Sequence, residues 1–192
     1  GEFLWLDAEE QLDAVTALLP SPLDVPPVKG VNPKNEAEEQ ERSTDPASPI
    51  SALAFKVVTD QHVGRLVYIR VYSGTLESGD TVFNPSTRDR ERIGRLLRMH
   101  ADRREEIKSA GAGEIVAAIG LKNVFTGHTL CAVDAPIVLE AIKFPEPVLS
   151  VAVEAKTRGD QDKMSQALVR LSDEDPTLRV STNSESGQII LA

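Results

Sequence analysis

A run of arginines between residues 88 and 104 is the part of the sequence with the clearest chemical potential. The stretch RDRERIGRLLRMHADRR holds seven arginines against three acidic residues, which gives a local net charge of +4. Guanidinium groups bind phosphate oxygens through paired N–H donors, so such a surface can hold structured RNA by its backbone without reading bases. The same composition equally fits a solvated strand face whose arginines pair with neighbouring carboxylates.

Catalytic patterns are absent from the sequence. It has no GxxxxGK[ST] phosphate loop, no GxGxxG fingerprint and no GxSxG nucleophile elbow. The histidines His62, His100 and His128 are widely separated, and the single cysteine, Cys131, has no cysteine partner for a disulfide or a thiolate metal site. The residues therefore predict no enzyme active site, no metal site and no cofactor within this chain.

The net charge of −9 is unevenly distributed along the chain. Residues 1–50 carry 11 acidic and 3 basic side chains, net −8, whereas residues 51–192 carry 19 and 18, net −1. The acidity of the first part therefore does not exclude a nucleic-acid partner for the rest. Because no apolar run approaches the length of a membrane span and no signal peptide opens the chain, we expect a cytoplasmic protein without a membrane partner.

The first 48 residues are predicted to hold a helix, an extended tail and a loop. Apolar residues at 12, 15, 18 and 19 share one side of a helix that ends before Pro20, within a first segment of residues 1–32. Residues 33–48 contain the acidic run NEAEEQE, which lacks apolar surface to bury. We predict a mobile, acidic, flexible loop there, over residues 33–47 in particular.

Residues 49–143 show short β-branched runs separated by turns, a pattern typical of a β-barrel of six to eight strands. Within RVYSGTLESGDTVFN, Gly74 and Gly79 are predicted to change the direction of the chain, leaving Leu76 to point into the core.

The segment ERIGRLLRMH could form a helix or a strand. Gly94 and the alternation of strands and turns that follows favour a strand. On a strand, Arg98 and His100 share one face and Leu97 and Met99 share the other. Arg103 and Arg104 (both within the run described above) would then follow at the turn.

Residues 144–192 are predicted to form a second unit, with a boundary at Phe144–Pro147. A strand in LSVAVEAK, a helix over residues 160–176 and a hairpin of LRVST with QIILA give the order β-α-β-β. This is the first part of a ferredoxin-like fold. A helix face and a sheet edge would stay uncovered in such a partial fold, so self-association through this unit is expected.

Several long motifs carry a family resemblance. GRLVYIRVYSGTLESGDTVFN, RLLRMHA, AGAGEIVAAIGLKN, FPEPVLSVAVEAKTRGDQDKM and SQALVRLSDEDPTLRVST occur in this order. From about Leu12 to Ala192 the chain closely resembles bacterial-type elongation factor G, the GTPase that drives translocation of tRNA and mRNA. The resemblance implies the end of a GTPase domain, a translation-factor β-barrel as domain two and a partial ferredoxin-like domain three, hence a mainly β plus α+β fold.

The resemblance also implies a role. It suggests a ribosome-binding, noncatalytic fragment, with GTP and magnesium bound in a GTPase domain outside it. Expected partners are the ribosome, through small-subunit rRNA and a small-subunit ribosomal protein, and that GTPase domain. The candidates for contact with rRNA are Arg98, His100, Arg103 and Arg104, and the candidates for contact with the GTPase domain are Gly120, Leu121 and Lys122.

Two alternatives stay open. A tetracycline-resistance ribosomal protection protein shares these domains, and a protein-binding β-barrel without an RNA role would leave the arginines solvated. The chain also departs from the family pattern in NVFTGHTL, where His128 replaces an acidic residue and Phe125 a small polar one.

Overall fold

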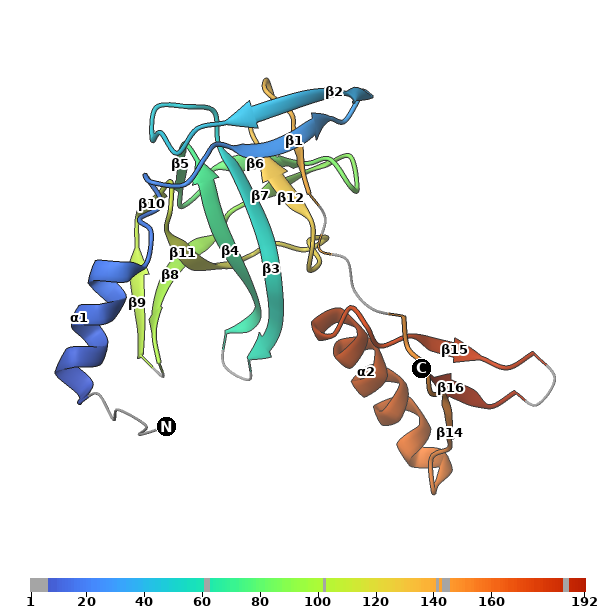
Figure 1. Ribbon diagram of the computed structural model, residues 1–192. Coiled ribbons are helices and arrows are strands. Elements are labelled where there is room, and N and C mark those ends of the chain that lie inside the picture. Colours follow the sequence, from blue (N-terminus) through green and yellow to red (C-terminus); the bar gives the residue numbers. More distant parts are fainter. Residues whose placement is uncertain (1–6, 61–62, 102, 141, 143–145, 185–186) are drawn as a thin grey trace.

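The computed structural model describes residues 7–60, 63–101, 103–140, 142, 146–184 and 187–192 (Figure 1). His62, Asp102 and part of the predicted boundary at Phe144–Pro147 lie outside these residues. The helices are α1 (Ala8–Leu18) and α2 (Arg158–Glu174). The strands are β1 (Val28–Asn32), β2 (Asn35–Arg42), β3 (Ser51–Asp60), β4 (Gly64–Ser73), β5 (Thr75–Glu77), β6 (Thr81–Asn84), β7 (Asp89–Arg92), β8 (Arg95–His100), β9 (Arg103–Ile107), β10 (Ser109–Gly111), β11 (Ile115–Ile119), β12 (Thr129–Cys131), β13 (Val138–Leu139), β14 (Val151–Val153), β15 (Val180–Thr182) and β16 (Ile189–Leu191).

An eight-stranded antiparallel sheet forms the main body, in the order β7-β6-β12-β3-β4-β11-β8-β9. Strands β7 and β8 lie near opposite ends of this order but follow each other in the chain, separated only by Ile93 and Gly94. The amide of Gly94 donates to the carbonyl of Ile119 (2.9 Å), which ties this connection to β11. The sheet therefore closes on itself, and the predicted β-barrel is confirmed.

Two glycines turn the corner between β4 and β6. Gly74 and Gly79 have φ angles of 73° and 95°, in the left-handed region that favours glycine. Between them β5 pairs with β10 and buries Leu76 completely. The direction changes and the inward position of Leu76 predicted from the sequence are confirmed.

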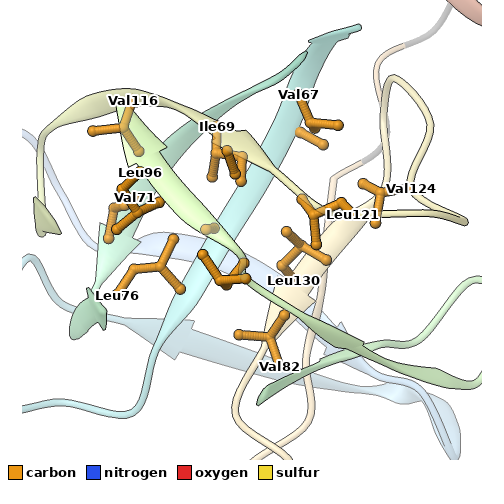
Figure 2. Packing of buried hydrophobic residues seen from close by; sticks show 14 of the residues in the cluster. Val67, Ile69, Val71, Leu76, Val82, Leu96, Val116, Leu121, Val124 and Leu130 are labelled. Carbon is orange, nitrogen blue, oxygen red and sulfur yellow. The ribbon is translucent and has the colours of Figure 1, made fainter. Parts of the chain in front are cut away.

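The core is filled from many strands at once. Figure 2 shows the side chains of β4, β8, β11 and the loop after β11 meeting inside the sheet. Tyr68 and Leu66 alternate with these core residues of β4 and pack on the outer face against Leu97 and Met99. Both faces of β4 are thus covered. The labelled core residues are Val67, Ile69, Val71, Leu76, Val82, Leu96, Val116, Leu121, Val124 and Leu130.

The prediction of a mobile loop over residues 33–47 is wrong for residues 35–42, which form strand β2. Strand β2 pairs antiparallel with β1, which pairs in turn with β13. The acidic side chains of β2 from Glu38 onward are exposed, so the composition resembled that of a disordered segment. The backbone groups of β2 nevertheless bond to β1, the strand just before it in the chain. Gly30 makes this small sheet possible, because a Cβ there would lie 2.5 Å from the carbonyl oxygen of Val138.

The C-terminal unit consists of α2 and a three-stranded sheet in the order β14-β16-β15. The predicted β-α-β-β order is confirmed. Leu168 of α2 is the one buried apolar side chain among the described residues from 146 to 192. Glu174, at the end of α2, accepts a hydrogen bond from the backbone N–H of Thr59 in β3 (2.7 Å), which links the unit to the barrel.

Helix α1 begins with a capping box, in which Asp7 accepts from the amide of Glu10 and Glu10 accepts from the amide of Asp7. None of its residues is buried, and the apolar side chain of Leu18 is 79% exposed. In the described residues, neither α1 nor α2 offers an apolar stretch long enough to cross a bilayer.

Candidate nucleic-acid interface

The predicted RNA-facing residues lie together on the hairpin formed by β8 and β9. Arg98 stands opposite Glu105, and His100 stands opposite Arg103 in the register of the two strands. Ala101 begins the turn with a φ of 53°. The strand interpretation of RLLRMH is therefore confirmed, and all four candidates occur within one hairpin.

Arg98 is held by a carboxylate from the neighbouring loop. Its Nη2 lies 2.6 Å from Oε1 of Glu114, while Oε2 of Glu114 accepts the backbone N–H of Gly111 (2.7 Å). The Gly111 amide and then Arg98 lower the pKa of Glu114, because both stabilise the ionised carboxylate. Arg98 is thus oriented by a group that stays charged near neutral pH.

The other three candidates differ in their surroundings. Arg104 forms an ion pair with Asp60 at the end of β3, and this hydrogen bond raises the pKa of Arg104. Nε2 of His100 lies 3.8 Å from Oε2 of Glu105. Arg103 is exposed and has no carboxylate within ion-pair distance among the described residues. The hairpin therefore combines two arginines held by carboxylates, Arg98 and Arg104, with a third, Arg103, whose guanidinium group can bind an external anion.

The predicted interdomain residues form a tight turn after β11. Gly120 has a φ of 101° and packs against Gly94, since a Cβ at this position would lie 3.2 Å from the Gly94 Cα. Leu121 is buried in the barrel core, and the side chain of Lys122 is exposed. The turn thus presents one charged side chain and anchors itself with one apolar side chain.

Two residues that sequence reasoning missed hold this turn from both sides. Both carboxylate oxygens of Glu91 accept backbone N–H groups, from Lys122 and Asn123, at 3.0 Å each. Arg65 donates to the carbonyl oxygen of Lys122 and, at 2.7 Å, to that of Val124. The signal for Glu91 was present in the sequence, because alternation along β7 puts it on the opposite side of the strand from Arg90 and Arg92.

His128 and Phe125, which depart from the family pattern, belong to the same loop. Nδ1 of His128 accepts from the backbone N–H of Phe125 (3.3 Å) and from Nδ2 of Asn84 (3.1 Å). Burial lowers the pKa of His128, so the neutral ring that these two donors require is favoured. The Phe125 ring meets His128 edge to face at 5.5 Å, and the Arg65 guanidinium lies 4.8 Å from the Phe125 centroid.

The described residues also bear on whether the chain holds a metal site or a reactive thiol. Among the described residues, no three His, Cys, Asp or Glu side chains are grouped closely enough to hold a metal ion. Cys131 is buried in an apolar cluster with Leu53, Ile137 and Leu139, and this burial raises the pKa of its thiol, so the reactive thiolate is disfavoured. What the arrangement can do chemically is present oriented cations and backbone turns to a large partner.

Comparisons with known proteins agree with this architecture. The family profile described as Elongation factor Tu domain 2 matches residues 64–131, and that described as Elongation Factor G, domain III matches residues 144–192. Proteins named elongation factor G from three strains of Dehalococcoides mccartyi (BAV1, CBDB1 and 195) are each 57% identical over 180 residues, which is 94% of this chain. The chain spans 26% of the length of these relatives.

A crystal structure of a protein from Thermus thermophilus is similar in fold as well. It superimposes with a TM-score of 0.71 at 26% sequence identity, covering 94% of this chain and 24% of that one. The similarity therefore extends over the barrel and the C-terminal unit together.

Proposed function

Because the chain belongs to the elongation factor G family, we propose that it is a noncatalytic, ribosome-contacting part of such a translocation factor. In the whole protein, GTP and magnesium would bind in a GTPase domain, and this part would contact the small ribosomal subunit. The observation that carries the proposal is the β8–β9 hairpin, which gathers Arg98, His100, Arg103 and Arg104 at one tip of the barrel.

The ion pairs of this hairpin are compatible with RNA contact. A guanidinium group has five N–H donors in a rigid fork, and a carboxylate on one edge leaves other donors for a phosphate oxygen. Glu114 and Asp60 would then orient Arg98 and Arg104. Arg103 would add a positive charge that can bind a phosphate without first losing a carboxylate partner.

The turn at Gly120–Lys122 suits a contact with a neighbouring domain. Glu91 and Arg65 restrain its backbone on two sides, so little conformational entropy would be lost when a partner binds. We assign this turn to the interface with the GTPase domain, and a partner in that position would meet the exposed side chain of Lys122.

Binding to purified small ribosomal subunits at a series of salt concentrations tests the proposal. Contact through arginines predicts an affinity that falls log-linearly with salt, and Arg103→Glu should weaken it without lowering the melting temperature. Lys34→Glu, an equal charge change in the β1–β2 turn, serves as the control. A GTPase assay of this chain alone should detect no turnover, and measurable hydrolysis would contradict the noncatalytic assignment.

A protein-binding barrel is the second candidate, and one observation favours it. Arg98, Arg104 and Arg95 each lie within ion-pair distance of a carboxylate, as expected for a solvated face without an RNA role. Binding to the small subunit that is absent or insensitive to salt would support this candidate. A tetracycline-resistance ribosomal protection protein would share the contacts proposed above, and the names of the relatives favour the elongation factor.

A further inference from the structure

A second group of arginines lies on strand β7. Arg90 stands opposite Phe83 and Arg92 opposite Thr81, while Glu91 between them stands opposite Val82. Since Val82 and Glu91 are buried on the inner side, alternation puts both arginines on the outer face. Arg88 precedes the strand in the turn, with a φ of 61°.

These three arginines have no acidic partner in the described structure. Arg88, Arg90 and Arg92 are exposed, and within the described part of the chain no carboxylate lies within ion-pair distance of any of them. Asp89 is exposed beside them, whereas Glu91 points inward and is occupied by two backbone amides. Unlike Arg98 and Arg104, these arginines share none of their guanidinium donors with a carboxylate of the described residues, so all of these donors can face an anion.

The β7 arginines are separated from the β8–β9 hairpin. Figure 1 shows the β6–β7 hairpin at one end of the barrel and the tip of β8 and β9 at the other. Along a strand, residues two apart are separated by about 7 Å and face the same side. Arg90 and Arg92 therefore form a short, flat row that is a surface of its own.

We propose that the β7 row, Arg88, Arg90 and Arg92, is a second phosphate-binding surface, which takes the backbone of an RNA segment other than the one at the β8–β9 hairpin. RNA is favoured over an acidic protein because no large apolar side chain of β6 or β7 is exposed in the described structure. A protein interface is usually centred on apolar or aromatic contacts, whereas a row of guanidinium forks matches phosphate oxygens. The choice of RNA rests on the proposed function.

The double variant Arg90→Gln/Arg92→Gln in the full chain tests this surface. Its binding to small ribosomal subunits and to an RNA duplex of about 16 base pairs is measured across a salt series. Loss of two phosphate contacts should make the slope of log affinity against log salt shallower by about 2. The matched control, Arg158→Gln/Arg170→Gln on exposed positions of α2, removes the same charge elsewhere.

The expected result is weaker binding and a shallower slope for the β7 variant, with the control and the melting temperature unchanged. Unchanged binding of the β7 variant, or an equal loss in the control, would overturn the inference while the Arg103 result still supports the proposed function. Duplex binding that depends on β7, without binding to small subunits, would support the inference and refute the proposed function. Displacement by polyglutamate more readily than by the duplex would assign the row to an acidic protein and overturn the inference, and no binding of either RNA probe would overturn both.

Discussion

The barrel and the C-terminal unit bury their apolar residues to very different extents. In the barrel, β3, β4 and β11 contribute residues that are completely inaccessible, and even the outer face of β4 is covered. In the C-terminal unit Val148 and Leu149 are 93% and 81% exposed. A sheet that closes on itself encloses its own core, whereas one helix on a three-stranded sheet covers one face only. We therefore expect the barrel to supply most of the stability of the chain.

The largest difference should appear on truncation of core leucines. Leu76→Ala in the barrel leaves a cavity that the closed sheet cannot collapse, with an expected loss of about 3 to 5 kcal/mol in the free energy of unfolding. Leu168→Ala in α2 should remove little more than its transfer free energy, about 2 kcal/mol. Chemical denaturation followed by tyrosine signals reports the barrel, because both tyrosines lie in β4, and hydrogen exchange of the α2 amides reports the loss in the Leu168 variant. Equal losses would mean that the C-terminal unit is packed as rigidly as the barrel.

The next largest difference in stability is expected when a glycine with a positive φ angle is replaced by alanine in each of the two units. Gly74 and Gly187 have φ angles of 73° and 71°, but a Cβ at Gly74 would lie 2.6 Å from the carbonyl oxygen of Ser48, while one at Gly187 meets nothing within 4 Å. Gly74→Ala adds a backbone clash to the left-handed strain, so it should destabilise by about 2 to 3 kcal/mol, against about 1 kcal/mol for Gly187→Ala. Thermal melting of both variants measures the difference. A cost for Gly187→Ala that matches Gly74→Ala would show that strain alone, without the clash, explains the barrel corner.

Replacing a carboxylate by an amide should also cost more stability in the barrel, where Glu91 is buried, than in the C-terminal unit, where Asp175 is exposed. Glu91→Gln leaves one of the two part-buried backbone amides that bond to the buried carboxylate facing an NH₂ group instead of an acceptor, with an expected loss of about 1 to 3 kcal/mol. Asp175→Asn in the exposed turn after α2, where Asp175 accepts from the amide and hydroxyl of Thr177, should lose less than about 1 kcal/mol. Hydrogen exchange at Lys122 and Asn123 checks the cause, since it should accelerate only in the Glu91 variant.

The smallest expected effect is a pH dependence confined to the barrel. Burial lowers the pKa of His128 below its ordinary value of 6.5, so the unfolded chain takes up a proton before the folded chain does. Stability is therefore complete above about pH 6.5 and decreases as the pH falls below it. Tyrosine-monitored melting should show this slope, and His128→Gln should reduce it. Residues 146–192 contain no histidine, so the melting of α2 should not follow the same slope.

Local rules predicted the barrel well, and they failed where an acidic composition concealed a strand that pairs with its neighbour in the chain. Leu76 between two glycines and the alternation of β8 follow from backbone sterics and strand periodicity, which act over a few residues. Strand β2 was missed because its acidic side chains carry no sign of the pairing with β1. Composition was enough to find the candidate arginines. It could not predict which of them bind a carboxylate, as Arg98 and Arg104 do, and which do not.

The sequence by itself determined where the chain turns and which side of each strand faces inward, because positive φ angles and the two-residue period are properties of neighbouring residues. The tertiary structure decided which charges meet. Arg98 reaches Glu114, Arg104 reaches Asp60, and Glu91 reaches the amide of Lys122. Each of these contacts joins different strands or loops, so only the pairing of strands and the closure of the barrel could bring the partners together.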